Sequence, residues 1–346
     1  MKKRVFKLIV CICIVYCLLT CFSRIKSAVE NAVNIWVNVI VPSVFPYMVL
    51  AKYISGSDIL NLFEVFPGKI ISKVFRLSGC SVKPFLCSLF CGYPSGAICA
   101  SDLYNRKMIH KDEAKRLICF TNNAGPLFLI SAVGRGMLGS FEKGIVIYFI
   151  HIVSAMIYGF FCSIGKKVKS QLNSDSNKYT ADICLSIKYA VDATVNICGF
   201  MIAAYVISEC FIILTDKIVL FSPHKEYIEF FIRGTFEISA GVTYAGRLNI
   251  PGFKFAFVCA LVSWSGISVI MQIKSVAGNI ITTKEIIKSK LCQAILSFCM
   301  GYIAEYLLNN KTDYIPSKDY SLILSLIFSV ILFSYYLYNK KKKLPD

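Results

Sequence analysis

A run rich in glycine and proline interrupts the apolar segment Pro84–Ser101, which carries no charged residue. Within it stand Gly92, Pro94, Ser95 and Gly96. Proline suits the first turn of a helix, and a serine hydroxyl can satisfy free backbone N–H groups there. A half-helix beginning here would direct the positive end of its dipole at an anion or a polar group. The run therefore predicts a solute-binding site. The alternative is a packing kink in which small residues ease helix contact.

Two adjacent amides mark a second break. Asn122 and Asn123 lie in the uncharged stretch Leu117–Gly134 and are followed by Gly125 and Pro126. Amides at membrane depth are costly unless they bond to a partner helix or to a ligand. Because asparagine both donates and accepts, it suits a carboxylate, a hydroxyl or a ring nitrogen. We expect these residues to bind the solute, with hydrogen bonding between helices as the alternative.

A third break, at Ser265 and Gly266, interrupts the uncharged segment Phe255–Ile273. We expect it to complete the same site near the bilayer midplane. Two ionisable residues lie close to such segments. Glu237 precedes an uncharged run and could take a coupling proton or bind a cation such as sodium. Arg135 could face the solute, or it could mark the end of a span by extending toward the interface.

Metal, cofactor and catalytic chemistry find little support in the residue pattern. The chain has 16 cysteines and 3 histidines but no C-x-x-C pair, so neither a zinc site nor a disulfide framework is predicted. Gly92–Gly96 reads G-x-x-S-G, which differs from the G-x-S-x-G elbow of serine hydrolases. We expect no metal, no cofactor and no enzymatic activity.

The solvent of this chain is predicted to be a lipid bilayer. Of its 346 residues, 56% are apolar, and the mean hydropathy is +0.62; soluble domains have roughly 45–50% apolar residues. The net charge is +18, and the basic residues responsible for it lie between the apolar stretches, as in loops beside anionic lipid. We predict an all-α polytopic protein of the cell membrane, with lipid as its partner and no nucleic acid. The longest uncharged stretches are Asn31–Ala51, Pro84–Ser101, Leu117–Gly134, Gly144–Gly165, Phe255–Ile273 and Tyr320–Asn339.

The order of segments predicts five parts. Residues 1–30 form an N-terminal transmembrane segment, which we expect to be retained because it has a poor signal-cleavage site. Residues 31–165 form a first repeat, and residues 166–182 a polar linker. Residues 183–340 form a second repeat, and residues 341–346 a basic tail.

The repeat rests on similarity between the halves. Phe85–Leu89 resembles Phe257–Leu261, about 170 residues further on, and small residues follow both. Such weak similarity is typical of transporters built from inverted repeats. Basic residues flank both Pro84–Ser101 and Phe255–Ile273, which predicts that each is a re-entrant helical hairpin. The orientation stays open, because both termini are basic while the expected number of crossings is odd.

The run Cys91–Ser140 closely resembles the YlbJ family of sporulation integral membrane proteins, also called stage V sporulation protein V. These proteins carry the nucleoside-recognition or Gate domain, which is related to concentrative nucleoside transporters. The matching motifs are G-Y-P-x-G-A at Gly92–Ala97, E-A-x-R-L at Glu113–Leu117, N-x-G-P at Asn123–Pro126 and the glycine-rich Gly134–Gly139. The second half matches more loosely, through Phe236, Glu237 and Gly241 and through Ser263–Gly266. Cys91 and Cys99 depart from the small or basic residues expected at their positions.

The resemblance implies two Gate-like repeats that transport dipicolinate, a dicarboxylated pyridine, across the mother-cell-derived membrane of a forespore. One alternative is a Gate-type transporter of a nucleoside or a metal ion. Another is a scaffold or enzyme of spore-envelope assembly that transports nothing.

Overall fold

The computed structural model describes residues 2–55, 72–167, 182–218, 224–246, 248 and 252–309. Within these ranges the elements are helices joined by turns, and no strand occurs, which confirms the all-α class. The predicted span Tyr320–Asn339, the basic tail 341–346 and most of the polar linker lie outside the described residues.

Five described helices are long and apolar enough to cross a membrane: Phe22–Leu50, Phe141–Ser163, Ile183–Asp216, Lys254–Ala277 and Thr283–Leu307. Many of their exposed side chains are large and apolar, as a lipid-facing surface requires. Leu185 and Phe149 are both 61% exposed, for example. The polytopic membrane architecture is therefore confirmed.

The helices follow one another in a repeated order. The first half has α1 (Lys2–Thr20), α2 (Phe22–Ile35), η1 (Trp36–Ile40), α3 (Val41–Ser55), η2 (Gly79–Ser81), α6 (Val82–Cys91), α7 (Ser95–Asn105), α8 (Lys111–Phe120), the π-helical η3 (Phe128–Met137) and α9 (Phe141–Ser163). The second half has α10 (Ile183–Asp216), α11 (Lys225–Phe236), α12 (Ile238–Ala245), α13 (Lys254–Trp264), α14 (Gly266–Ala277) and α15 (Thr283–Asn309).

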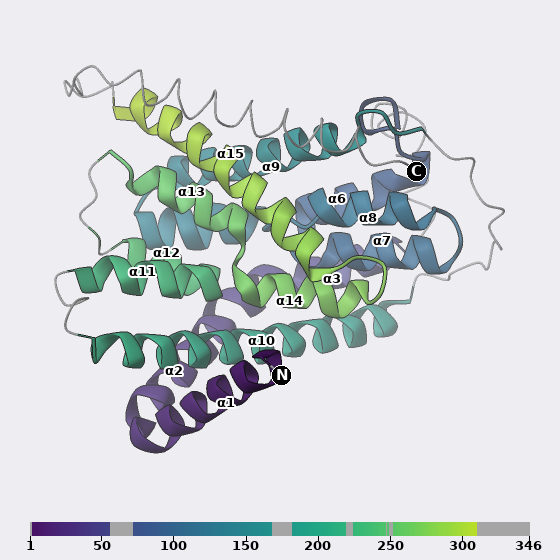
Figure 1. Ribbon diagram of the computed structural model, residues 1–346. Helices are drawn as coiled ribbons and strands as arrows, with labels where there is room; N and C mark the ends of the chain where they lie inside the picture. The colour runs from purple at the N-terminus through teal and green to yellow at the C-terminus, as the bar shows by residue number, and fades with distance from the viewer. Residues whose placement is uncertain are drawn as a thin grey trace.

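Two pairs of short helices form hairpins, and Figure 1 places them toward opposite ends of the long helix α10. In the first hairpin, α6 and α7 pack together, with the sulfur atoms of Cys87 and Cys99 3.3 Å apart. This confirms a hairpin at Pro84–Ser101. In the second hairpin, α11 and α12 meet at two glycines, where a Cβ on Gly241 would lie 2.4 Å from the Cα of Gly234.

The predicted second hairpin, Phe255–Ile273, is wrong in position. It is broken at Ser265–Gly266 as expected, but α13 packs mainly on α15 while α14 packs on α10 and α7. Figure 1 shows α13 and α14 following one another across the molecule. A glycine in an uncharged segment indicates where a helix breaks, and it does not indicate whether the chain then turns back. Lys254 and Lys274 flank the segment in sequence and lie at its opposite ends.

The same pattern of a helix broken without turning back occurs in the first half, where α8 ends at Phe120 and η3 begins at Phe128. Each half therefore contains a long span, a hairpin, a broken helix and a final span. Corresponding helices begin about 140 residues apart, rather than the 170 expected. The pairs are α6 and α11, which begin at Val82 and Lys225, and α8 and α13, which begin at Lys111 and Lys254. This pairing, with hairpins at opposite ends, is the order of elements that an inverted repeat would have.

The packing joins the halves. One buried apolar cluster combines α6, α7 and α8 with α14, as in the contacts around Ile118 and Ile270. A second combines η3 and α9 with α11, α12 and α13, around Leu129 and Val258. Each hairpin thus packs beside one part of both broken helices, and the two turns and the two breaks lie between the clusters.

Candidate functional site

The turn of each hairpin touches the break in one helix. A Cβ on Gly92 would lie 2.9 Å from the backbone nitrogen of Gly125. In the other half, a Cβ on Gly266 would lie 3.0 Å from the Cα of Glu237. Both glycines have positive φ, +75° and +81°, a conformation that side chains rarely adopt. Each half thus has one such backbone contact between predicted residues, and the two contacts match.

A central cavity of about 40 Å³ lies between these contacts. Predicted residues Gly92, Gly125 and Glu237 line it, and Tyr93 and Gln272 add polar groups. The remaining lining is apolar and comes from the spans, η3, the second hairpin and α14: Ile40, Val44, Phe128, Ile197, Met201, Ile238 and Val269. Since one water needs about 10–15 Å³, the cavity has room for only a few water molecules.

The hairpin residues Ser95 and Gly96 hold the first turn in shape. The Ser95 hydroxyl donates to the carbonyl of Gly92 at 2.6 Å and lies 3.0 Å from that of Cys87. A Cβ on Gly96 would lie 1.5 Å from the carbonyl oxygen of Thr121, so only glycine fits. Pro94 immediately precedes the first residue of α7. Ser95 and Gly96 therefore pack the turn against α6 and the break.

The two amides have different surroundings. Asn122 accepts from the N–H of Ala97 at 2.9 Å and donates to the carbonyl of Ile118 at 2.7 Å, so its amide joins α7 to α8. Asn123 donates to the carbonyl of Phe120 and to Ser88, while its Oδ1 is buried with no hydrogen-bond partner among the described residues. The helix-bonding alternative thus fits Asn122, and Asn123 keeps an acceptor available to a ligand or a water.

The second hairpin places a carboxylate at its turn. Glu237 is 3% exposed, and its Oε2 accepts from the N–H groups of Ser239 and Ala240 at 2.6 and 3.1 Å and from the Ser239 hydroxyl. The carboxylate therefore caps α12. Nearby, Ser265 has a left-handed backbone, with φ 69°, at the break before Gly266.

Arg135 lies apart from these residues. Its side chain is exposed in the last turn of η3, and it does not line the central cavity. This position favours the alternative over a side chain that faces the solute. The alternative of a residue at the end of a span fits, because η3 ends at Met137, which lies against Thr243 and Gly246 at the end of α12.

Sequence reasoning missed a buried lysine. Lys290 in α15 is 1% exposed, and its ammonium donates to the carbonyl of Asn122 and lies 5.6 Å from the ring centroid of Tyr93. In the sequence it stands close to Lys284 and Lys288, so it resembles a basic flank of a span. The available signal was helical spacing, which places it on a different face from Lys288.

A buried histidine network was missed as well. His151 accepts from the N–H of Ala124 through Nε2 at 3.0 Å, and its Nδ1 lies 2.9 Å from the Ser263 hydroxyl. Because Nε2 accepts, the proton is assigned to Nδ1. Ser263 continues to Ser297 at 2.6 Å, and Ser297 to Ser154 at 2.8 Å. This network ties the first break to α9, α13 and α15. Its signal was a histidine in the middle of an uncharged span.

The E-A-x-R-L motif anchors the entry to the first hairpin. Glu113 is 4% exposed and accepts from the N–H and hydroxyl of Ser78 and from the hydroxyl of Ser81. Arg116 donates to the carbonyls of Phe75 and Arg76. Both charged residues thus hold the backbone that leads into α6, away from the central cavity.

Comparison with known proteins finds similarity to the sporulation integral membrane protein YlbJ of Bacillus subtilis (strain 168). The two are 28% identical over 132 residues, which cover 38% of this chain and 32% of that relative. The match thus spans about a third of the relative's length. No family profile matches the chain, and no solved structure does. The chain is therefore a membrane protein with a relative among sporulation integral membrane proteins.

Proposed function

We propose that this protein transports a small anionic solute across a bilayer, with dipicolinate across a forespore membrane as the first candidate. The arrangement of elements supports transport, because two hairpins from opposite ends meet two broken helices around a central cavity. Irregular backbone at membrane depth is tolerated where it is buried in protein or lines a polar cavity. The name of the relative supports the link to sporulation.

The burial of Lys290 is the main observation that supports an anionic solute. Its ammonium is buried beside the first break, and among the described residues no carboxylate oxygen lies within 4.0 Å of it. A buried charge without a counter-ion is costly. A carboxylate bound between Lys290 and the first hairpin would supply that counter-ion. The N-termini of α7 and α14, which begin at the turn and at the second break, would add partial positive charge.

The size of the cavity implies that binding and movement are linked. Sites for ring-sized ligands have volumes of about 300–1,000 Å³, and the central cavity has about 40 Å³. In this proposal the structure represents a closed state, and a dicarboxylated ring would enter only when a hairpin turn separates from its break. Because the hairpins lie toward opposite ends, moving one or the other would open the site to one side at a time.

The test is uptake of labelled dipicolinate into liposomes that contain the purified protein. We expect uptake by the wild type, and a loss of about tenfold or more in apparent affinity for Lys290→Met, because a charge-assisted hydrogen bond contributes roughly 1.5–3 kcal/mol. Lys288→Met is the matched control, since Lys288 is exposed on the same helix.

Three outcomes would contradict the proposal. Equal uptake by Lys290→Met and Lys288→Met would remove the argument for an anion at Lys290. Uptake of labelled nucleosides in place of dipicolinate would favour the Gate-type nucleoside alternative. Uptake of neither solute by folded protein would favour a scaffold.

A further inference from the structure

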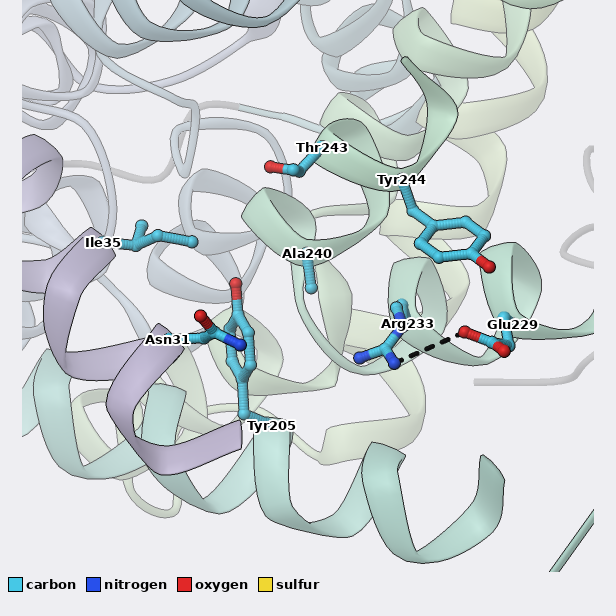
Figure 2. Close-up of a pocket in the computed structure, with 8 residues that line it drawn as sticks. All are labelled: Asn31, Ile35, Tyr205, Glu229, Arg233, Ala240, Thr243 and Tyr244. Atoms are coloured by element: carbon cyan, nitrogen blue, oxygen red, sulfur yellow. Dashed lines mark hydrogen bonds and ion pairs between the residues drawn. The ribbon is translucent and has the colours of Figure 1, made fainter. Parts of the chain in front are cut away.

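A second and larger cavity lies beside the second hairpin. It has a volume of about 300 Å³ and opens between α2, α10, α11 and α12 (Figure 2). Its lining is polar for a membrane protein: Asn31, Ile35, Tyr205, Glu229, Arg233, Ala240, Thr243 and Tyr244. Arg233 bonds to Glu229 at 3.4 Å and to Glu209 at 3.0 Å. A cavity of this size and polarity holds several water molecules.

A chain of hydroxyl groups leads from this cavity to the central one. Tyr205 lines the larger cavity, and its hydroxyl lies 3.3 Å from the hydroxyl of Ser239. Ser239 donates to Oε2 of Glu237, and Glu237 lines the central cavity. All three side chains are buried, with exposures of 4%, 0% and 3%. The two cavities are thus joined by a continuous path of hydrogen bonds through Glu237.

We propose that this path delivers the coupling proton, so that Glu237 takes it up from water in the larger cavity. In the transfer, Ser239 passes its hydroxyl proton to Oε2 of Glu237, Tyr205 passes its own to Ser239, and a hydronium ion in the cavity restores the proton of Tyr205. One proton moves and every hydroxyl is regenerated. The coupling role rests on the proposed transport, whereas the proton path itself does not.

The surroundings of Glu237 favour a proton over a metal cation. Three donor hydrogens converge on Oε2, which leaves Oε1 as the remaining carboxylate oxygen, with Tyr93 and Gln272 as the other polar side chains lining the central cavity. A calcium ion takes about 6–8 oxygen ligands, more than these groups supply. The titratable groups facing Glu237 are Tyr93 from the first hairpin and Tyr205 from α10, with Arg233 of α11 beyond Tyr205. From α14 the neutral Gln272 lines the same cavity, and from α3 Val44 does.

Arg233 is bonded to Glu209 and Glu229, and among the described residues no ion pair joins it to Glu237. No described cation is therefore paired with Glu237. A bound proton would neutralise this carboxylate. The Glu237 side chain would then move with the hairpin through the membrane interior as a neutral group, which costs less than moving a charge.

The experiment follows the carboxyl band of Glu237 by time-resolved infrared spectroscopy after a pH jump, using purified protein without any solute. The band is identified by its loss in Glu237→Gln. We expect Tyr205→Phe and Ser239→Ala to slow its appearance by about tenfold or more, equivalent to roughly 1.4 kcal/mol in barrier. Tyr244→Phe is the matched control, since Tyr244 lines the same cavity but lies outside the hydroxyl chain. It should match the wild type.

Two results would overturn the proton path. One is a band that appears as fast in Tyr205→Phe and Ser239→Ala as in Tyr244→Phe. The other is a Glu237 carboxyl that does not titrate between about pH 4 and pH 10, a range wide enough for a strongly perturbed carboxyl. If Tyr205→Phe fails to fold, Ser239→Ala decides alone. Failure of dipicolinate uptake with an intact kinetic effect would reject the proposed solute and leave the proton path standing.

Discussion

Gly92 and Gly125 touch backbone to backbone, since a Cβ on Gly92 would lie 2.9 Å from the nitrogen of Gly125. This contact joins the turn of the first hairpin to the break after α8. Its counterpart joins Gly266 to Glu237 in the second half. The packing around the central cavity therefore depends on two positions that have no room for a side chain.

We expect Gly92→Ala to prevent the hairpin turn from closing on the break. The φ of +75° adds strain of about 1–3 kcal/mol for a side chain, and the clash adds to it. Gly139→Ala is the control, because Gly139 has a φ of +67° with nothing within 4 Å of its Cβ. The midpoint temperature of thermal unfolding and the rate of solute uptake should both be lower in Gly92→Ala than in Gly139→Ala. Equal effects of the two changes would mean that backbone strain alone matters.

The two asparagines should separate stability from transport. Asn122→Ala leaves the N–H of Ala97 without its partner, which costs about 1–3 kcal/mol of unfolding free energy. Asn123→Leu removes the unpartnered acceptor, and we expect a loss of roughly 10- to 100-fold in apparent affinity while the protein still inserts and folds. Thermal unfolding and uptake kinetics measure the two effects. Unchanged uptake by Asn123→Leu would assign this amide to helix packing.

The first hairpin can be tested by oxidation. The sulfur atoms of Cys87 and Cys99 are 3.3 Å apart, and a small movement would bring them to the disulfide length of about 2.05 Å. We expect mild oxidation to link these two cysteines, detected as one joined peptide by mass spectrometry, and Cys99→Ser to abolish the product. Joined peptides that pair Cys87 with other cysteines would contradict the packing of α6 on α7.

Glu113 should act on stability and not on the solute. Glu113→Ala leaves the N–H and hydroxyl of Ser78 and the hydroxyl of Ser81 unpaired, which we expect to cost several kcal/mol, at about 1–3 kcal/mol for each buried group. Glu113→Gln keeps one acceptor oxygen and should cost less. Thermal unfolding measures both. A large change in apparent solute affinity at unchanged stability would place Glu113 in the site.

Local features of the sequence were sufficient to locate the breaks. Gly92–Gly96, Asn122–Gly125 and Ser265–Gly266 each interrupt a helix where predicted, because glycine, proline and uncompensated amides disturb the helical ladder whatever surrounds them. The apolar composition likewise determined the bilayer as solvent, since backbone groups in lipid must be satisfied within helices.

Only the tertiary structure decided what each break does. The second hairpin turns at Glu237, where the sequence shows no proline and a capping carboxylate that resembles an ordinary helix start. Whether a chain turns back depends on the helices it packs against. Helix α13 packs mainly on α15, whereas α11 packs on α12, the helix that follows it. The same holds for Lys290, whose partner Asn122 lies 168 residues away in sequence. In the sequence, a lysine near the end of a span resembles a basic residue at the membrane boundary. Only the packing shows that it is buried beside a carbonyl.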